Sequence, residues 1–252
     1  MNQPDKIVPS AKPVKIVLVY QSLLGIYGDQ GNAKVAAKRL QLRGIDAEVV
    51  EVEPGEPMPD DADLYFLGGG EDMAQISALK ALQADGGLRR GVENGGVLLA
   101  VCAGFQICGK TLTVGGRDEV VDGLGLLDVE TRRADVRAVG EVLHRWTRPD
   151  GSESLITGFE NHGGHTTLGP QAKPLATVEV GVGNDGSGVE GAVQQVGKGW
   201  VYATYPHGPL LPRNPDLADH LLELALGREL EPLPMPEVDE LRRQRIEHAR
   251  SL

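Results

Sequence analysis

Residues 96–106 have the sequence GVLLAVCAGFQ, and this stretch decides the fold. The apolar run GVLLAV predicts a strand that is buried on both faces, and AGFQ suits the beginning of a helix. Cys102 lies at the turn between them, and Ala100 and Gly104 are small enough to permit a tight bend. Such a turn holds a nucleophile outward, and the N–H of Ala103 points to the place where an oxyanion forms. Cys102 is therefore the candidate nucleophile; the alternative is a buried structural cysteine.

The chain around this stretch alternates apolar runs with helical patterns in its first half. That alternation is typical of βαβ units on a parallel sheet with helices on its faces. The second half contains short apolar stretches separated by turn residues, which predict extra antiparallel strands. We expect an α/β fold with a mostly parallel sheet. Its strands should cover 14–20, 45–52, 63–67 and 96–101, with helices over 33–43 and 73–84. Later short strands should cover 136–146, 155–159, 175–182, 191–196 and 200–205.

The ends of the chain are predicted to lie outside one central domain. Asn214-Pro215-Asp216 should begin the last helix of that domain, with the Asn214 side chain as its N-cap. We expect the domain to cover 14–228, with an N-terminal extension over 1–13. The charged tail over 229–252 should form a peripheral helix or a frayed end.

Composition restricts the class of partner. The 252 residues contain 25 Lys and Arg against 36 Asp and Glu, a formal charge of −11 that repels nucleic acids and anionic membrane surfaces. No apolar run in the sequence is long enough to span a bilayer, and the first residues lack the pattern of a secretory signal, so we expect a cytoplasmic protein. Cys102 and Cys108 are too far apart on a helix for a disulfide, and Cys108 is predicted to be structural.

A nucleophilic cysteine requires an acid or a base and a place to hold an oxyanion. His207 follows the predicted strand 200–205, at a strand end where the catalytic groups of open α/β sheets gather. The sequence GGGED (68–72) follows another predicted strand, and consecutive glycines let backbone N–H groups converge on a negative atom. Gly69 and Gly70 are therefore candidate oxyanion donors; the alternative is a flexible connection.

Other histidines are weaker candidates. His162 and His165 lie in GFENHGGH (158–165), which we expect to form a glycine-rich turn that serves as a substrate wall or as a local hydrogen-bonded turn. With Glu160 these histidines could form a zinc site, although the spacing matches no standard pattern. Two further histidines lie in helical patterns and are expected to be solvated, namely His220 and His248.

Residues 104–111, GFQICGKT, match the nucleotide-binding P-loop pattern letter for letter. A P-loop requires a strand directly before its first Gly and a long helix from its Lys-Thr pair, and the following LTVGGR does not suit a helix. We treat the match as a coincidence and keep a P-loop nucleotide-binding module as the alternative from another class.

Taken in order, GGGED (68–72), AVCAGFQ (100–106) and YPHG (205–208) make the chain similar to the class I, triad-type glutamine amidotransferases. The resemblance implies a flavodoxin-like fold in which a cysteine and a distant histidine hydrolyse glutamine. That family carries a carboxylate two residues after the histidine, where this chain has Pro209. Another group must therefore orient His207, or the pair works as a dyad.

The proline is shared by the branch that contains cobyric acid synthases and the GatD subunits of lipid II isoglutaminyl synthase. Three further stretches resemble GatD subunits, so that the resemblance covers 14–228: YGDQGN (27–32), GFENHGG (158–164) and YPHGPLLP (205–212). A cobyric acid synthase would also carry an N-terminal ATP-grasping domain. Because only about thirteen residues precede the first strand here, we expect a stand-alone glutaminase subunit.

The resemblance also implies roles for single residues. Cys102 would attack the side-chain amide of L-glutamine, and His207 would protonate the departing ammonia. The oxyanion would be held by Gly69 or Gly70 together with Ala103. Arg137 falls where the GatD family has an arginine that contacts glutamine, although the sequence itself does not favour it over Arg132 or Arg133, and Gln106 is implied as a second substrate-binding residue.

The partner and the acceptor follow from the same resemblance. Ammonia would pass to a MurT-like Mur ligase subunit, which uses ATP and Mg to activate the D-glutamate α-carboxyl of lipid II, and the product would be D-isoglutamine in peptidoglycan. This chain would then be the glutaminase half of a heterodimer and would need no metal or cofactor of its own. The alternatives are an amidotransferase for another acceptor, such as a corrinoid acid, and a non-catalytic relative that keeps the fold as a docking surface.

Overall fold

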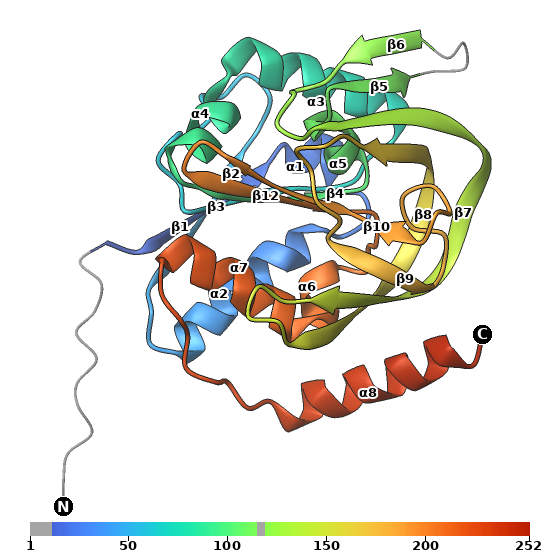
Figure 1. Cartoon of the computed structure of the whole chain (residues 1–252). Helices are drawn as coiled ribbons and strands as arrows, with labels where there is room; N and C mark the ends of the chain where they lie inside the picture. The colour runs from blue at the N-terminus through green and yellow to red at the C-terminus, as the bar shows by residue number, and fades with distance from the viewer. Residues whose placement is uncertain (1–11, 115–118) are drawn as a thin grey trace, which may run out of the picture.

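The computed structural model describes residues 12–114 and 119–252, which form two β-sheets and the helices around them. The first sheet lies in the middle with helices on both faces, and the second sheet curves around one side of it (Figure 1). Residues 1–11 of the predicted N-terminal extension lie outside the described part of the chain.

The first sheet has the strand order β2-β1-β3-β4-β12-β11. All neighbouring pairs are parallel except β11 with β12, which is antiparallel. The order 2-1-3-4 followed by a last parallel strand is the flavodoxin-like arrangement, so the predicted fold class is confirmed. The strands are β1 (Val14–Val19), β2 (Ala47–Val52), β3 (Leu64–Leu67), β4 (Val97–Val101), β11 (Ala192–Val196) and β12 (Gly199–Thr204).

Helices cover both faces of the first sheet (Figure 1). One face carries α2 (Gln30–Leu42), α6 (Leu210–Arg213) and α7 (Pro215–Leu226), and the other carries α1 (Gln21–Leu24), α3 (Asp72–Asp85), α4 (Gly87–Asn94) and α5 (Ala103–Cys108). The sequence did not predict α4, because GLRRGVEN contains two glycines and few apolar residues. The short α1 was also missed, since one turn of helix has no periodicity to detect.

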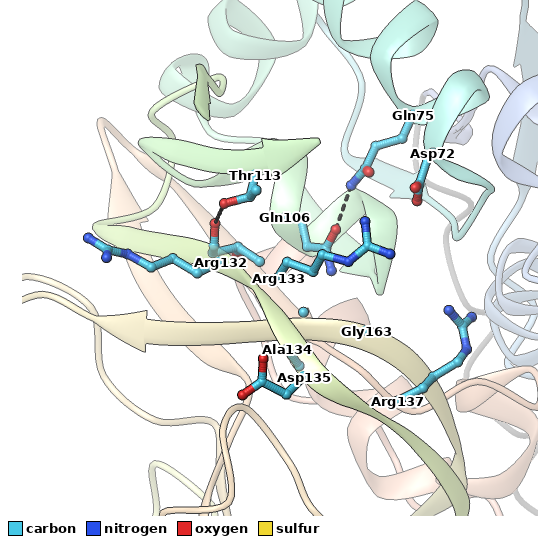
Figure 2. A pocket seen from close by; sticks show the side chains of 12 residues that line it. Asp72, Gln75, Gln106, Thr113, Arg132, Arg133, Ala134, Asp135, Arg137 and Gly163 are labelled. Atoms are coloured by element: carbon cyan, nitrogen blue, oxygen red, sulfur yellow. Dashed lines mark hydrogen bonds between the residues drawn. The ribbon is translucent and has the colours of Figure 1, made fainter. Parts of the chain in front are cut away.

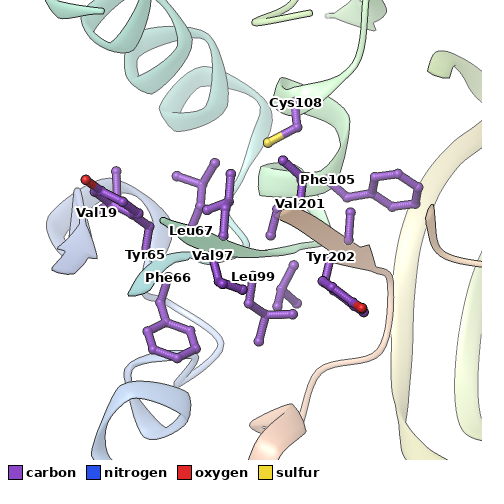
Figure 3. Packing of buried hydrophobic residues seen from close by; sticks show 14 of the residues in the cluster. Val19, Tyr65, Phe66, Leu67, Val97, Leu99, Phe105, Cys108, Val201 and Tyr202 are labelled. Carbon is purple, nitrogen blue, oxygen red and sulfur yellow. The ribbon is translucent and has the colours of Figure 1, made fainter. Parts of the chain in front are cut away.

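The core lies on both faces of the first sheet. Neighbouring residues on a strand point to opposite faces, as Phe66 and Leu67 do on β3 (Figure 3). Phe105 and Cys108 of α5 pack above the same sheet, and both are completely buried. Burial of a large apolar side chain contributes about 1.5–3 kcal/mol. The packed sheet therefore gives a rigid support to the carboxyl ends of β1, β3, β4 and β12.

A long hairpin dominates the second sheet. Its strands β7 (Val129–Thr147) and β8 (Glu153–Leu168) contain 19 and 16 residues, so the prediction of only short strands here is wrong. Residues 158–165 lie inside β8, and the glycine-rich turn predicted there is also wrong. The register shifts between Arg133 and Ala138, where β7 has an irregularity. The other strands are β5 (Thr111–Val114), β6 (Glu119–Asp122), β9 (Ala176–Val180) and β10 (Val189–Glu190).

Asn214 precedes α7, but its side chain does not cap that helix. Its Oδ1 accepts a hydrogen bond from the N–H of Thr157 at 2.8 Å, and its Nδ2 donates to the carbonyl oxygens of Thr157 and Leu210, each at 2.8 Å. The predicted capping bond is therefore wrong. The carboxamide instead ties β8 to the segment that leads from α6 into α7.

The C-terminal segment contains a helix, α8 (Pro236–Arg250), which packs against the hairpin of the second sheet. Arg242 donates to the carbonyl oxygen of Leu155 at 2.5 Å and to the hydroxyl of Ser154 at 3.0 Å. Across residues 12–114 and 119–252, no helix has both the length and the apolar character needed to cross a bilayer.

Candidate active site

Cys102 lies at the carboxyl end of β4, in the turn that leads into α5. Its φ of 52° and ψ of −104° place it in a region that non-glycine residues rarely adopt. Its N–H donates to the carbonyl oxygen of Thr204 at 2.9 Å, on the neighbouring strand β12. A Cβ on Gly104 would lie 2.5 Å from the carbonyl oxygen of Leu67, so only glycine fits there. The chain therefore makes the sharp strand-to-helix turn that the sequence predicts.

His207 follows β12, so it lies beside Cys102 at the same edge of the sheet. Its N–H donates to the carbonyl oxygen of Phe159 at 3.0 Å, and the N–H of Phe159 donates back at 3.2 Å. These two bonds attach the histidine backbone to β8. The residue is only 4% exposed, and the sulfur of Cys102 is close enough to raise the pKa of its ring.

Asp29 is the acidic partner of His207. Its Oδ2 lies 3.4 Å from Nδ1 of the imidazole, and the residue is only 3% exposed. The same oxygen accepts a hydrogen bond from the N–H of Gly69 at 2.9 Å. Asp29 lies in YGDQGN, a stretch that carries the family resemblance, but nothing in the sequence pairs it with a histidine far along the chain.

The environment of His207 favours its protonated form. Burial alone would lower the pKa of His207, because desolvation penalises the imidazolium. The Asp29 carboxylate and the Cys102 sulfur outweigh that effect and raise the pKa to about 10. His207 therefore carries a proton at neutral pH. A cation beside a cysteine stabilises the thiolate, which is the nucleophilic form of the side chain.

The run Gly68–Gly70 connects β3 to α3 directly beside the imidazole. A Cβ on Gly69 would lie 2.5 Å from Cε1 of His207. Because the N–H of Gly69 donates to Asp29, it is not available to an oxyanion. In the part of the chain that the structure describes, the N–H groups of Gly70 and Ala103 have no acceptor. Of the three predicted oxyanion donors, these two remain.

A cavity of about 280 Å³ lies beside the nucleophile turn, between α3, α5, β5, β7 and β8 (Figure 2). Cys102 and His207 do not line it, but Gln75 and Gln106 do, and both contact the nucleophile turn. Nε2 of Gln75 donates to the carbonyl oxygen of Ala103 at 3.2 Å and to Oε1 of Gln106 at 2.7 Å. The cavity is large enough for an amino acid the size of glutamine.

Both predicted substrate-binding side chains line this cavity. Arg137 lies at the irregularity in β7, and its Nε donates to Oδ1 of Asn161 at 2.6 Å. Gln106 donates to the hydroxyl of Tyr205 at 3.4 Å. Arg132 and Arg133 line the cavity too, and the side chain of Arg132 extends away from Arg137 (Figure 2).

The zinc site considered for Glu160, His162 and His165 is not formed. The first two side chains are buried, whereas His165 is exposed on the other face of β8. Glu160 accepts backbone N–H groups from the loop after β9, and the ring of His162 stacks on Tyr205 with centroids 3.7 Å apart. Among the described residues, no group of three or more His, Cys, Asp and Glu side chains could hold a metal ion.

The P-loop alternative is wrong. Residues 103–108 form α5, and the Lys110-Thr111 pair leads into strand β5 rather than a helix. Cys108 is buried, as predicted, and burial raises the pKa of its thiol to about 12.

The two histidines that were predicted within helical patterns differ from each other. His220, which was expected to be solvated, is only 7% exposed, and its Nε2 lies 2.7 Å from the Tyr202 hydroxyl. That prediction is wrong, because the helical pattern of α7 does not reveal which of its polar residues faces the sheet. His248 is exposed on α8, as predicted.

Fold and site together define an α/β protein with a cysteine and a histidine at the carboxyl ends of adjacent parallel strands. Residues 15–215 match the model of the CobB/CobQ-like glutamine amidotransferase domain. The chain therefore belongs to the CobB/CobQ-like glutamine amidotransferase family.

Relatives from within the family cover most of the chain. The GatD subunit of lipid II isoglutaminyl synthase (glutamine-hydrolyzing) from Staphylococcus aureus is 33% identical over 219 residues, which are 86% of each chain. The subunit of the same name from Streptococcus pneumoniae is 30% identical over 92% of this chain and 88% of its own. A cobyric acid synthase from Sphingopyxis alaskensis is 34% identical over 65% of this chain, but only 32% of its own length is matched.

Solved structures have the same fold. A crystal structure of a glutamine amidotransferase matches 84% of this chain and 98% of its own, with a TM-score of 0.56 and 26% identity. The structure of PurLQS from Thermotoga maritima matches 86% of this chain and 98% of its own, with the same TM-score of 0.56. At 18% identity, this second likeness concerns the fold alone.

Proposed function

We propose that this chain is a glutaminase subunit in which Cys102 and His207 hydrolyse L-glutamine and release ammonia. The observation that carries the proposal is the strained turn at Cys102, with φ of 52°, beside an imidazole that Asp29 holds at 3.4 Å. Backbone strain at a non-glycine residue costs about 1–3 kcal/mol and is retained where function requires it. A buried structural cysteine needs neither the strain nor the charged neighbours.

The chemistry follows from the positions of these groups. The Cys102 sulfur attacks the side-chain carbonyl carbon of glutamine, and the N–H groups of Gly70 and Ala103 hold the developing oxyanion. His207 gives its proton to the nitrogen as the C–N bond breaks, and ammonia leaves. Water then attacks the thioester, with His207 taking one of its protons, and glutamate departs from the restored sulfur. Asp29 keeps the imidazole oriented and stabilises its charged form.

The cavity offers charges of both signs to a zwitterionic amino acid. Arg137 on β7 suits the α-carboxylate of glutamine, because a guanidinium forms paired hydrogen bonds with carboxylates. Asp72, at the beginning of α3, lines another side of the cavity and suits the α-ammonium group (Figure 2). Gln106 lies between the cavity and the nucleophile turn, where it lines the path of the side-chain amide.

The acceptor of the ammonia is proposed from the relatives. Two GatD subunits of lipid II isoglutaminyl synthase match this chain over 86% and 88% of their own length, whereas the cobyric acid synthase is matched over 32% of its length. We infer a MurT-like partner subunit in the cytoplasm that uses ATP to activate the D-glutamate α-carboxyl of lipid II. The ammonia made here would convert that group to the amide of D-isoglutamine. A corrinoid acid as acceptor is the second candidate.

Glutamate release from L-glutamine by the purified chain, alone and with its partner, tests the proposal. Cys102→Ala should abolish release while the folded structure and partner binding survive. Cys108→Ala is the matched control, since it removes the thiol at the other end of α5, and it should retain activity. Release that persists in Cys102→Ala would contradict the proposal. The ligase that co-purifies with the chain then identifies the acceptor.

A further inference from the structure

Glu190 is a fully buried carboxylate that has no part in the chemistry described above. Its exposed fraction is 0%, and it is the last residue of β10, just before the chain passes from the second sheet to β11 of the first. A buried carboxylate is costly unless hydrogen bonds compensate for lost water. The partners that compensate Glu190 belong to the segment that carries His207.

One oxygen of Glu190 holds the end of β12. Oε1 accepts a hydrogen bond from the hydroxyl of Thr204 at 2.6 Å and another from the N–H of Tyr205 at 2.9 Å. Thr204 is also the residue whose carbonyl oxygen accepts the N–H of Cys102 at 2.9 Å. Only Pro206 separates Tyr205 from His207. Glu190 therefore contacts the short segment that links the backbone of the nucleophile to the imidazole.

Glu190 is itself held firmly. The carboxamide of Asn184 accepts the N–H of Gly191 at 2.7 Å and donates to the carbonyl oxygen of Gly191 at 3.0 Å. Gly191 has a φ of 65°, and a Cβ there would lie 2.4 Å from the carbonyl oxygen of Ala203. The backbone next to Glu190 is thus fixed against β12, which makes its carboxylate a rigid support.

We propose that Glu190 is a positioning residue of the hydrolytic reaction, which sets the place of His207 relative to Cys102 by holding Thr204 and Tyr205. This inference rests on the proposed function. Pro209 occupies the position where related triads carry a carboxylate after the histidine. In this chain the carboxylate of Glu190, on β10, holds the backbone just before the histidine, while Asp29 contacts the imidazole ring.

The surroundings of Glu190 make its support dependent on pH. Its other oxygen, Oε2, lies 3.9 Å from Nε2 of His144 on β7, and Glu160 on β8 and Tyr205 are the other titratable groups that face it. Burial raises the pKa of Glu190 to about 7, against the opposing effect of the hydrogen bonds from Thr204 and Tyr205. Burial lowers the pKa of His144 to about 4, so this histidine stays neutral near pH 7. Ionisation of Glu190 above pH 7 makes the bonds to Thr204 and Tyr205 charge-assisted, and these are stronger than neutral ones.

Steady-state kinetics of three variants test the inference. Glu190→Ala removes both hydrogen bonds and should lower kcat at least tenfold, with the KM for glutamine within twofold of wild type, because Glu190 does not line the cavity. Glu190→Gln keeps a carbonyl oxygen for both bonds, so it should restore most of kcat and show the same kcat at pH 6 and pH 8. Wild-type kcat should rise over that interval. Asp128→Ala, the control, removes a buried carboxylate that accepts the N–H of Gln171 at 3.0 Å and should leave kcat within twofold.

The inference is overturned if Glu190→Ala lowers kcat no more than Asp128→Ala does, or if Glu190→Gln is as impaired as Glu190→Ala. Where Glu190→Ala does not fold, Thr204→Val removes one of the two bonds and should lower kcat several-fold at unchanged KM. An unchanged kcat in Thr204→Val would also overturn the inference.

A second measurement separates this inference from the proposed function. The rate at which iodoacetamide alkylates Cys102, followed by mass spectrometry, depends on His207 but not on glutamine hydrolysis. If the wild type releases no glutamate, the proposed function fails, and slower alkylation in Glu190→Ala than in Asp128→Ala still supports the positioning role. If the wild type is active and alkylation is equal in the two variants, the positioning role alone fails.

Discussion

At the scale of single residues, Asp29 and Gly69 determine the charge and the position of the His207 imidazole. The carboxylate of Asp29 lies 3.4 Å from the imidazole and accepts the N–H of Gly69, so it joins the glycine run to the histidine. The absence of a Cβ on Gly69 leaves room for the ring. The imidazole is therefore held by a charge on one side and by close packing on the other, and each contact can be removed separately.

Asp29→Asn removes the charge but keeps a similar shape. The pKa of His207 should fall, because the acidic partner that raises it is gone, and kcat should fall by up to about 10⁴-fold, the loss seen when the acidic member of a triad is neutralised. Steady-state glutaminase assays measure the effect, with Asp46→Asn, the same substitution at an exposed position, as the control. Equal kcat in the two variants would show that Asp29 does not act on the histidine.

Gly69→Ala adds a single methyl group against the ring. The new Cβ would lie 2.5 Å from Cε1 of His207, so the imidazole must move, and kcat should fall at least tenfold with little loss of thermal stability. Gly140→Ala on β7 is the control, because no atom lies within 4 Å of a Cβ placed there. A Gly69→Ala enzyme with the kcat of Gly140→Ala would mean that the ring is free to shift.

At the scale of elements, the order of the strands in the first sheet brings the reactive residues together. Strands β4 and β12 are parallel neighbours, with Val101 opposite Thr204, so Cys102 and the His207 segment leave the sheet at the same edge. Ligands of open α/β sheets bind at this edge. The hairpin β7–β8 then brings the cavity side chains and Phe159 to the site from the second sheet.

Asn214 joins the two parts of this arrangement through its carboxamide. Asn214→Ala should lower the free energy of unfolding by about 2–4 kcal/mol, because it removes three hydrogen bonds and leaves the buried N–H of Thr157 without an acceptor. Urea denaturation measures the change. Asn94→Ala, which removes one exposed hydrogen bond of 3.2 Å to Asp60, should cost less than about 1 kcal/mol, and equal costs would contradict the role assigned to Asn214.

The central strands of the first sheet were predictable from the sequence because they are largely apolar runs. β1, β3 and β4 lie within one or two residues of the predicted ranges, and the glycines beside them mark the turns. In the second sheet, the strands predicted over 136–146, 155–159 and 175–182 overlap β7, β8 and β9. The length of the β7–β8 hairpin was not predicted, because β7 mixes charged and apolar residues over 19 positions with glycine and arginine inside the strand. For the site, a local pattern marks Cys102 and His207, whereas Asp29 and Glu190 act through contacts with distant segments that no local pattern reveals.

At the scale of the whole molecule, buried titratable groups contact both sheets. His220 on α7 is one of them, since it packs against Trp146 of β7 and pairs with Tyr202 of β12. Burial, with a smaller contribution from Arg148, lowers the pKa of His220 to about 4. A neutral buried histidine stabilises the fold above its unfolded pKa of 6.5, and this contribution is lost as the pH falls toward 4.

His220→Gln should therefore flatten the dependence of stability on pH. Between pH 6.5 and 4 the wild type should lose about 3 kcal/mol more of its free energy of unfolding than the variant does. Urea denaturation at several pH values measures this difference. His165→Gln, at an exposed position on β8, should keep the wild-type slope, and an unchanged slope in His220→Gln would contradict the assignment.

The most direct test of the central claim is the site at which a glutamine-like diazoketone modifies the protein. Cys102 and Cys108 lie in one segment, GVLLAVCAGFQICGK, and fragment spectra can distinguish adducts on the two sulfurs. We predict a single adduct on Cys102, formed more slowly in His207→Ala and suppressed by L-glutamine. An adduct on Cys108, or no adduct on either thiol while the protein is folded, would contradict the claim that Cys102 is the nucleophile.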